Sequence, residues 1–377
     1  MNSARHLHIV CFDIPFPADY GGAIEEWYKI KTLAQLGIKI HLHCFEYNGR
    51  KPDKEIDSVC EKVYYYKRER KLTDALSKIP FIVKSRMQDE LLQNLCKDNY
   101  PILFDATHTT GFINHPALQE RKKAVRLHNI EWIYYRVLLA DAVSLKEKIY
   151  YFSEYKKLKK YDSVLANADF LSCLSQTDLE YYQTMFPEKS ISFEAVFHEN
   201  TTVTAIHGKG DYILYHGNLS LTDNYAYVIE LIEHQLKSSE YKIIIAGKNP
   251  DEALCNCIAK YAHITLVANP NQEELALLVK NAQACLAFAR NPSGVKLKLI
   301  NSLFQARFVI ANEAALTGSN LSDLVISCET EDLNSVINQL MQQEFTTEII
   351  EKRKNKLLSL YNNQSNAEAL IKTIYHG

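Results

Sequence analysis

Short apolar segments alternate with amphipathic ones along most of the chain. In the first half, the segments with the length and hydrophobicity of buried parallel strands are 6–12, 39–45, 63–66, 102–106, 124–127 and 170–174. In the second half, they are 212–216, 242–246, 264–267, 284–288, 308–311 and 324–327. Helical patterns separate several of these segments, which predicts an α/β fold with two Rossmann-like parallel-sheet domains.

The two predicted domains are joined by a segment that has neither the strand nor the helix periodicity of apolar residues. Segment 187–210 contains FHENTTVTAIHGKG, which is polar and contains glycine, as is typical of interdomain connections. We place the boundary at His198, so that the N-terminal domain spans 1–198 and the C-terminal domain spans 199–343. The last segment, 344–377, is helical in pattern.

The stretch 291–312 contains the strongest candidate for a binding site. The apolar run 284–288 is followed by Pro-Ser-Gly at 292–294, then by a helical period and a second apolar run. Strand, loop, helix and strand form a βαβ crossover, and ligands of open parallel sheets bind at the carboxyl ends of the strands. The loop 290–296 is predicted to lie at such an end.

The chemistry of this loop favours an anion. First-turn N–H groups of a helix carry about half a positive charge, and Arg290, Lys296 and Lys298 add full charges near the same point. A diphosphate fits this environment, and the amide of Asn301, one turn beyond Lys298, is placed to reach a neighbouring sugar hydroxyl. A helix whose lysines are merely solvated is the alternative interpretation.

This stretch resembles the nucleotide-sugar loop of family 4 glycosyltransferases of GT-B fold, in which a G-x-x-x-K-x-x-E pattern opens the donor-binding helix. Gly294, Lys298 and Asn301 fall on the Gly, the Lys and the final acid of that pattern. The two glutamates of the usual E-x7-E motif are replaced by Ser293 and Asn301. The resemblance implies two Rossmann-like domains facing a cleft: an acceptor-side domain over 1–198, a nucleotide-sugar domain over 199–343, and a terminal helix in 344–377 that packs back toward the first.

The same resemblance implies further donor-binding residues. Gly21 and Gly22 follow the first predicted strand and are expected near the donor phosphates, although a tight strand-to-helix turn explains the pair equally well. In the loop that begins at Gly217, relatives carry an Arg and a Lys six residues apart, and this chain has Asn218 and Asn224.

Without that basic pair, the charge of the departing diphosphate must be balanced elsewhere. We expect Lys298, Arg290 and Lys296 to stabilise it. Lys248 and Glu313, at neighbouring strand ends, are expected as additional donor contacts.

Two histidines are candidates on the acceptor side, because His108 and His128 each follow a predicted strand. In the resembling enzymes a histidine at the position of His128 lies close to the transferred sugar, so His128 is expected to be catalytic together with Lys298. Glu131 is expected to orient His128 or to bind the acceptor, and His108 is assigned to the acceptor side. A structural histidine at a strand end, or a helix cap for Glu131, is the alternative.

Composition narrows the function classes. The chain has 377 residues, a hydrophobic fraction of 47% and a net charge of −2. Near-neutral charge argues against a nucleic-acid binder, and no apolar run approaches the ~18 residues of a membrane span. The N-terminus enters a strand without a signal-peptide pattern, and the nine cysteines are scattered like buried thiols, so we expect a reducing, cytoplasmic location.

One basic aromatic segment, KEKIYYFSEYKKLKKY at 146–161, is long enough for a helix. It predicts either a solvated helix face with tyrosines packed beneath, or a helix that rests on the anionic inner face of a membrane near a lipid-linked acceptor.

These patterns together predict a hexosyltransferase-type glycosyltransferase, similar to bacterial enzymes of polysaccharide biosynthesis. It would transfer a sugar from a nucleotide-diphosphate donor to a glycan or lipid-linked acceptor, with retention of configuration by resemblance. No cofactor or metal is expected, since the sequence contains no D-x-D. A non-catalytic GT-B partner subunit and a sugar-nucleotide epimerase are the alternatives, and the replaced glutamates argue against the epimerase.

Overall fold

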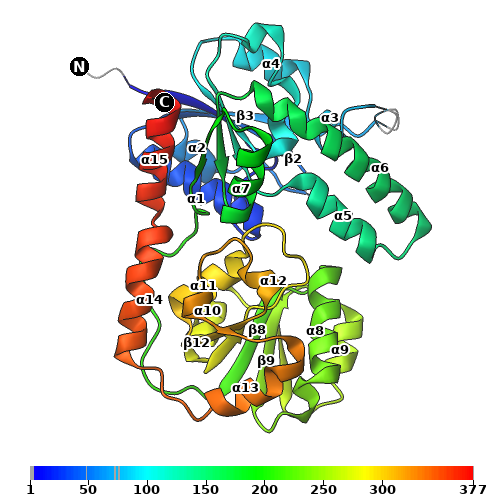
Figure 1. The fold of residues 1–377 in the computed structure, drawn as a ribbon, viewed down its shortest axis with the longest axis vertical. Helices are drawn as coiled ribbons and strands as arrows, with labels where there is room; N and C mark the ends of the chain where they lie inside the picture. The colour runs from blue at the N-terminus through cyan, green and yellow to red at the C-terminus, as the bar shows by residue number, and fades with distance from the viewer. Residues whose placement is uncertain (1–3, 48, 72–73, 75–76, 377) are drawn as a thin grey trace. The chain divides into compact units, whose positions relative to one another are not determined.

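The computed structural model describes residues 4–47, 49–71, 74 and 77–376. The chain forms two compact units, one made of Met1–Glu199 with Tyr361–Gly377 and the other of Asn200–Leu360. Figure 1 shows that each unit has its own sheet with helices packed on it.

The first unit is built on a seven-stranded parallel sheet in the order β3-β2-β1-β4-β5-β6-β7. Its strands are β1 His6–Val10, β2 Lys39–Glu46, β3 Lys62–Lys67, β4 Ile102–Asp105, β5 Lys123–Leu127, β6 Phe170–Cys173 and β7 Ser190–Phe193. Its α-helices are α1 Gly21–Gln35, α2 Lys54–Val59, α3 Phe81–Lys84, α4 Asp89–Leu95, α5 Glu131–Asp141, α6 Leu145–Tyr161, α7 Gln176–Met185 and α15 Asn363–His376.

The second unit is built on a six-stranded parallel sheet in the order β10-β9-β8-β11-β12-β13. Its strands are β8 Tyr212–Asn218, β9 Lys242–Lys248, β10 Ile264–Ala268, β11 Ala284–Leu286, β12 Phe308–Ala311 and β13 Ile326–Ser327. Its α-helices are α8 Thr222–His234, α9 Glu252–Ile258, α10 Gln272–Asn281, α11 Leu297–Gln305, α12 Glu313–Leu316, α13 Leu333–Leu340 and α14 Thr347–Leu360. The predicted α/β architecture with two parallel sheets is confirmed.

One strand lies inside the segment predicted as a connection. β7, within 187–210, pairs in parallel with β6 at the edge of the first sheet. Its four residues, SISF, are exposed or half-buried rather than fully buried. Such a short edge strand has too few apolar positions for its periodicity to be recognised in the sequence. The predicted interdomain connection 187–210 was therefore wrong in its first part, which contains β7.

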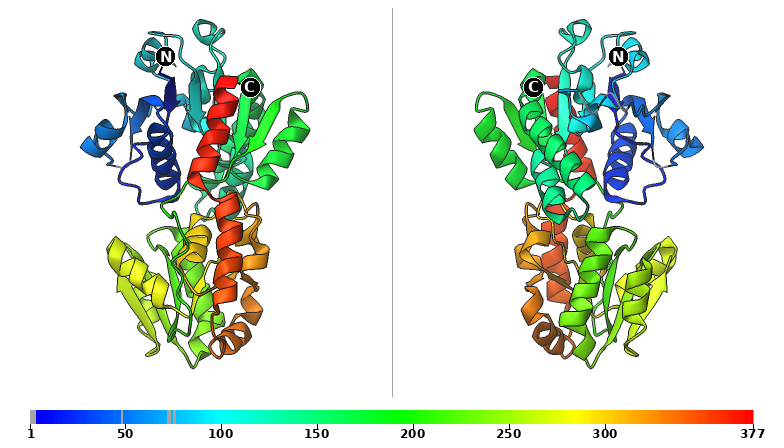
Figure 2. Two further views of the ribbon diagram at one scale, coloured as in Figure 1. Left: turned by 90° about the vertical axis from the view of Figure 1, so that its left-hand side faces the viewer. Right: turned by 90° about the vertical axis from the view of Figure 1, so that its right-hand side faces the viewer.

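The C-terminal segment forms two helices, α14 and α15, which belong to different units. The buried Arg353 of α14 donates to the carbonyls of Leu303, Ala306 and Arg307, which ties α14 to the second unit. Figure 2 shows α14 running alongside the second unit. The helix stops after Leu360, and α15 then packs against α1 of the first unit. No helix among the described residues is long and apolar enough to cross a bilayer.

Candidate functional site

The second sheet reverses its direction of strand addition between β8 and β11. From β8 the chain adds β9 and β10 on one side, and it then places β11, β12 and β13 on the other. In open parallel sheets, ligands bind beyond the carboxyl ends of the strands at such a switch point. The ends of β8 and β11 therefore mark the place for a ligand in this unit, and the loop 290–296 follows β11.

Lys298 lies at this switch point. Its Nζ donates to the main-chain carbonyl of Phe288, just beyond β11, and lies 3.4 Å from the hydroxyl of Tyr215 on β8. Burial, reinforced by the charge of Lys296, lowers the pKa of Lys298 to about 7. Within the described part of the chain, no acidic group lies close enough to counter this shift. An anion bound here would supply the missing counter-charge.

The loop before α11 is folded by its own main chain. Gly294 has φ 68°, in the left-handed region that favours glycine. Lys296 is the N-cap residue of α11, and its Nζ donates to the carbonyls of Ser293 and Gly294. The ammonium group of Lys296 is thereby held within the loop that precedes Lys298.

Three residues expected near the diphosphate have partners within the second unit. They are Arg290 and the two asparagines that stand where relatives carry a basic pair. Arg290 forms an ion pair with Glu230 of α8. Asn218 Oδ1 accepts from the main-chain N–H of Ser220 at 3.1 Å, and Asn224 donates to the carbonyl of Asn218 at 2.9 Å. The two asparagines thus shape the turn after β8, and the charge of Arg290 is balanced.

The other predicted donor residues also belong to the carboxyl edge of this sheet. Gly217 and Lys248 lie at the ends of the paired strands β8 and β9, and Glu313 begins α12 with an exposed side chain. Asn301 lies one turn into α11, and its Oδ1 accepts from the amide of Asn200 at 2.8 Å. The structure therefore places these residues along one edge of the second sheet, and the partner of Asn301 was not predicted.

The first sheet has its own switch point, between β1 and β4. Asp105, the last residue of β4, forms a buried ion pair with Lys29 of α1 and lies 2.8 Å from Nε2 of His128, just beyond β5. Burial acts to raise the pKa of Asp105, but Lys29 and His128 outweigh it and keep the pKa below its usual range. Because Asp105 is an anion, Nε2–H of His128 donates to it, and this hydrogen bond fixes the orientation of the ring. The His128 side chain is 11% exposed.

A second buried ion pair supports this arrangement. Arg126 on β5 lies 2.5 Å from Glu25 of α1, whose carboxylate is also 3.6 Å from Lys29. Burial acts to raise the pKa of Glu25, but Arg126 and Lys29 hold it below its usual range. Helix α1 is therefore fixed to the sheet by paired charges as well as by apolar packing.

Three residues near this point have the chemistry of metal ligands. Ligand atoms of Cys11, Glu26 and Asp105 lie within 4.8 Å of one another. Burial, reinforced by Asp105, raises the pKa of Glu26 well above its usual range, and burial raises that of the Cys11 thiol. Since Asp105 is already paired with Lys29 and His128, this set does not fit a cation.

Glu131 does not orient His128, contrary to one of its two expected roles. Its Oε1 lies 3.8 Å from Nδ1 of His108, within the 3₁₀ helix Thr107–Phe112. Burial raises the pKa of Glu131 to about 8 and lowers that of His108 well below its usual range, so both are neutral at pH 7. Asp105 takes the orienting position that was expected for Glu131.

Gly22 has a packing reason for its lack of a side chain. A Cβ at this position would lie 2.7 Å from the ring of Phe12. That ring packs against His108 and His128, with ring centres 5.3 and 5.5 Å away. Gly21 begins α1 beside it. Gly22 is therefore explained by its packing against Phe12, whether or not the pair also approaches a ligand.

The two parallel-sheet units define the GT-B fold, and comparison with known proteins agrees. No protein-family model matches the chain. An "uncharacterized 44.6 kDa protein in cps region" of Klebsiella pneumoniae is 25% identical over 355 residues, covering 86% of this chain and 88% of that protein.

Solved structures show the same fold over the full length of the chain. TarM has a TM-score of 0.70 at 11% identity, with 99% of both chains covered. Sucrose-phosphate synthase of Thermosynechococcus elongatus has a TM-score of 0.69 at 13% identity, with 98% of both chains covered. Anabaena Alr3699/HepE, solved with UDP and glucose, has a TM-score of 0.63 at 10% identity, with 98% of this chain and 99% of that chain covered.

Several residues of both sites were not predicted from the sequence. They are Lys29, Asp105, Tyr215 and Asn312, of which Asn312 accepts from the N–H of Ala289 at 3.0 Å and donates to its carbonyl at 2.7 Å. One of them could have been found from the sequence. Asp105 is the last residue of the apolar segment ILFD, and a charged residue at the end of a buried parallel strand is expected at the carboxyl edge of the sheet, where ligands bind.

Proposed function

We propose that this protein is a glycosyltransferase that transfers a sugar from a nucleoside-diphosphate donor to a glycan or lipid-linked acceptor. One observation carries the proposal. Lys298 lies at the switch point of the second sheet, partly buried, next to the N-terminus of α11 and without an acidic neighbour among the described residues. Such a group stabilises the negative charge that develops on a departing diphosphate.

In this proposal the second unit binds the nucleotide and the first contributes His128 to sugar transfer. The Nδ1 of His128 is the acceptor for a sugar hydroxyl, and Asp105 keeps the imidazole in the required tautomer. The segment Gly294–Asn301, similar to the family 4 donor loop, supports a hexosyl donor and retention of configuration. Ser293 and Asn301 replace the glutamates of that family, so Lys298 and the helix N-terminus carry more of the leaving-group stabilisation.

A ligand screen on the whole chain tests this function. Thermal unfolding is measured with UDP-, GDP- and ADP-sugars, and UDP-glucose is a natural first choice because HepE was solved with UDP and glucose. We expect one nucleotide class to stabilise the protein, by about 2.7 kcal/mol at a hundredfold excess over Kd. Slow donor hydrolysis without acceptor should accompany binding. Binding without hydrolysis or transfer would favour a non-catalytic partner, and no binding at all would contradict the proposal.

The α5–α6 hairpin supports a lipid-linked acceptor. Figure 1 shows the two helices side by side, extending from the sheet of the first unit. Large apolar side chains are exposed between the two helices and along the first half of α6: Val143 is 90%, Leu145 73%, Ile149 63% and Phe152 53% exposed. A groove of about 490 Å³ beside them is lined by Arg70, Lys71, Phe81, Lys146, Ile149, Tyr150, Ser153, Glu154 and Lys157. Exposed apolar residues next to lysines are typical of helices that lie on anionic membranes.

Vesicle sedimentation tests this contact. The wild-type chain is expected to bind vesicles that contain phosphatidylglycerol and to bind pure phosphatidylcholine weakly. The double change Ile149→Ser and Phe152→Ser should abolish the binding. Leu277→Ser is a matched control, because Leu277 is 59% exposed on α10 of the second unit. Equal binding by the double variant and the control would remove the membrane from the proposal.

A further inference from the structure

Four histidines face one another on two neighbouring strands of the first sheet. The parallel register places His8 beside His41 and His6 beside Lys39. Because side chains alternate along a strand, positions 6 and 8 share one face of β1, and positions 41 and 43 share one face of β2. These are the same face of the sheet, since His6 Nδ1 lies 3.0 Å from His41 Nε2 and His8 Nδ1 lies 2.8 Å from His43 Nε2.

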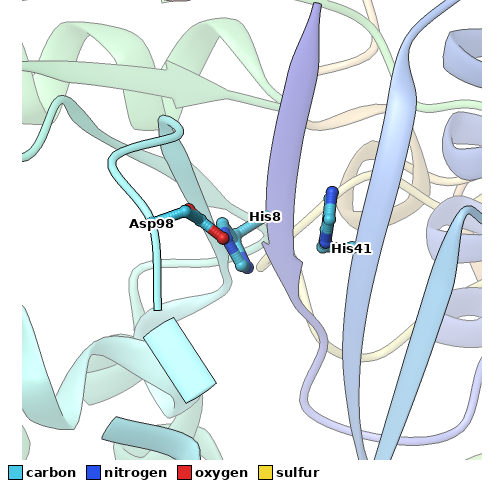
Figure 3. Close-up of side chains that lie close together, drawn as sticks. All are labelled: His8, His41 and Asp98. Atoms are coloured by element: carbon cyan, nitrogen blue, oxygen red, sulfur yellow. The ribbon is translucent and has the colours of Figure 1, made fainter. Parts of the chain in front are cut away.

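A carboxylate completes this cluster. Asp98 lies between α4 and β4, and its Oδ1 is 3.0 Å from Nε2 of His8. Figure 3 shows the Asp98 carboxylate turned toward the His8 ring, with His41 on the neighbouring strand. One ligand atom from each of His8, His41 and Asp98 lies within 4.8 Å of the other two.

We infer that His8, His41 and Asp98 form a binding site for a divalent transition-metal ion of the zinc class. Two imidazole nitrogens and one carboxylate oxygen are ligands that zinc accepts, with a fourth position left to water. Bonds of ~2.0–2.1 Å in tetrahedral geometry place neighbouring donor atoms roughly 3.4 Å apart. The donor atoms of the three side chains lie within 4.8 Å of one another, so they would draw closer together around the ion.

The surroundings of His8 match those of a metal ligand. Its Nδ1 faces His43 Nε2, and His43 Nδ1 lies 2.8 Å from the hydroxyl of Tyr66, which in turn accepts from Asn94 at 2.9 Å. Such a chain behind a ligating histidine fixes its orientation and leaves the other ring nitrogen for the metal. His8 is fully buried, and His41 is half-buried, so the ion would be reached from the solvent side of His41.

Lys62 is a positive charge near His41 and Asp98 that opposes a cation, and Arg121 is another. Its Nη2 lies 3.5 Å from Asp98 Oδ1. Most of its donors are directed elsewhere, to the carbonyls of Leu95, Asp98 and Tyr100. Asp98 therefore retains acceptor capacity for a metal.

The location separates this site from the proposed transfer chemistry. His8 lies in the middle of β1 and His41 near the start of β2, whereas Asp105 is the last residue of β4 and His128 follows β5 at the carboxyl edge of the same sheet. The ion would join β1, β2 and the Asp98 turn, and so stabilise the first unit. Its binding does not depend on whether the protein transfers a sugar.

Metal titration of the whole chain tests the inference. Protein freed of metal with a chelator is titrated with zinc sulfate by calorimetry, and with cobalt(II) by visible absorption. We expect one ion per chain, a rise in unfolding temperature, and a cobalt spectrum typical of nitrogen and oxygen ligands. His41→Ala and Asp98→Asn should each weaken zinc binding by about 100-fold or more. Changes to residues that only hydrogen-bond to metal ligands lower metal affinity by ~10–100-fold, and the loss of a ligand should cost at least as much.

His207→Ala is the control, because His207 is an exposed histidine of the second unit, 3.3 Å from Glu344. It should bind zinc as the wild type does. Asp98→Asn keeps the shape of the side chain, and His41 is half-buried, so both variants are expected to fold. Absence of a stoichiometric site in the wild-type chain, or unchanged affinity in both variants, would overturn the inference. A cobalt(II) spectrum with the bands of thiolate ligands would also overturn it, because it would show that the ion is bound by cysteines, such as the exposed Cys96.

Discussion

Replacing Lys298 with alanine is expected to weaken nucleoside-diphosphate binding by about one to two orders of magnitude. Its Nζ lies between the Phe288 carbonyl and the Tyr215 hydroxyl at the switch point, with no acidic neighbour among the described residues. A hydrogen bond to a charged group contributes ~1.5–3 kcal/mol, and each ~1.4 kcal/mol is a tenfold change in affinity. Calorimetric titration measures this loss, while affinity for the uncharged nucleoside is expected to be unchanged.

Lys237→Ala is the matched control for this variant. Lys237 is an exposed lysine of the 3₁₀ helix Leu236–Ser238, which precedes β9 and so lies toward the opposite edge of the sheet. It removes the same charge from the same unit. If Lys298→Ala binds the diphosphate as tightly as Lys237→Ala, the loop 290–296 is not the donor site, and the non-catalytic interpretation becomes the better one.

The same lysine makes binding depend on pH. Burial places the pKa of Lys298 at about 7, below its usual value, so the neutral amine predominates at pH 8. A diphosphate favours the ammonium form and raises that pKa, so binding at pH 8 should take up close to one proton. Affinity should therefore fall above pH 7. Calorimetry in buffers of different ionisation enthalpy measures the uptake, which Lys298→Ala should abolish.

Unfolding has the opposite dependence on pH. Because the folded pKa of Lys298 is lower than the unfolded one, the unfolded chain binds more protons between pH 7 and the usual lysine pKa. The contribution of this group to stability therefore rises with pH in that window.

Replacing His128 with alanine is expected to lower turnover by at least ~100-fold, in the range of a lost acid–base or positioning group. Stability should fall only modestly. Asp105 keeps Lys29 as its buried counter-charge, so the variant loses one hydrogen bond to a charged group, ~1.5–3 kcal/mol, rather than every partner of Asp105. Steady-state kinetics and thermal unfolding of the same preparation separate the two effects, and nucleotide affinity should be unchanged.

Two further variants make the result specific. His128→Gln keeps an amide able to bond Asp105 but has no imidazole, so it should be as inactive as His128→Ala. His115→Ala removes a histidine of the same unit that accepts from the N–H of Ala117 at 3.2 Å, and it should remain active. Full activity in His128→Gln, or a parallel loss of stability and turnover in His128→Ala, would show that His128 is structural.

The switch points explain why two distant stretches of the chain matter. Each unit gathers its candidate chemistry at the place where its sheet reverses the order of strand addition: Lys298 between β8 and β11, and Asp105 with its partners beside β1 and β4. The sequence predicted the strand ends but not the order of the strands. That order places Lys298 and Asp105 at the switch points of their sheets.

Local patterns by themselves determined the alternation of strands and helices, because side-chain periodicity and backbone stereochemistry act within a few residues. Helix α1 has Leu36 as its C-cap and is followed by Gly37 at φ 84°, the backbone conformation that favours glycine after a helix. The apolar residues Leu297, Ile300, Leu303 and Phe304 recur at helical spacing in the sequence, and all four are buried in α11.

Only the tertiary structure decided which charges are buried and with what. Glu25 meets Arg126 across 101 positions of sequence, and His8 meets His43 across 35. In the sequence, Glu25 and Lys29 are ordinary polar residues of an amphipathic helix. Sheet packing removes them from water, and a partner of opposite charge beside each of them offsets the cost of burial. That partner is set by strand order, which no local pattern encodes.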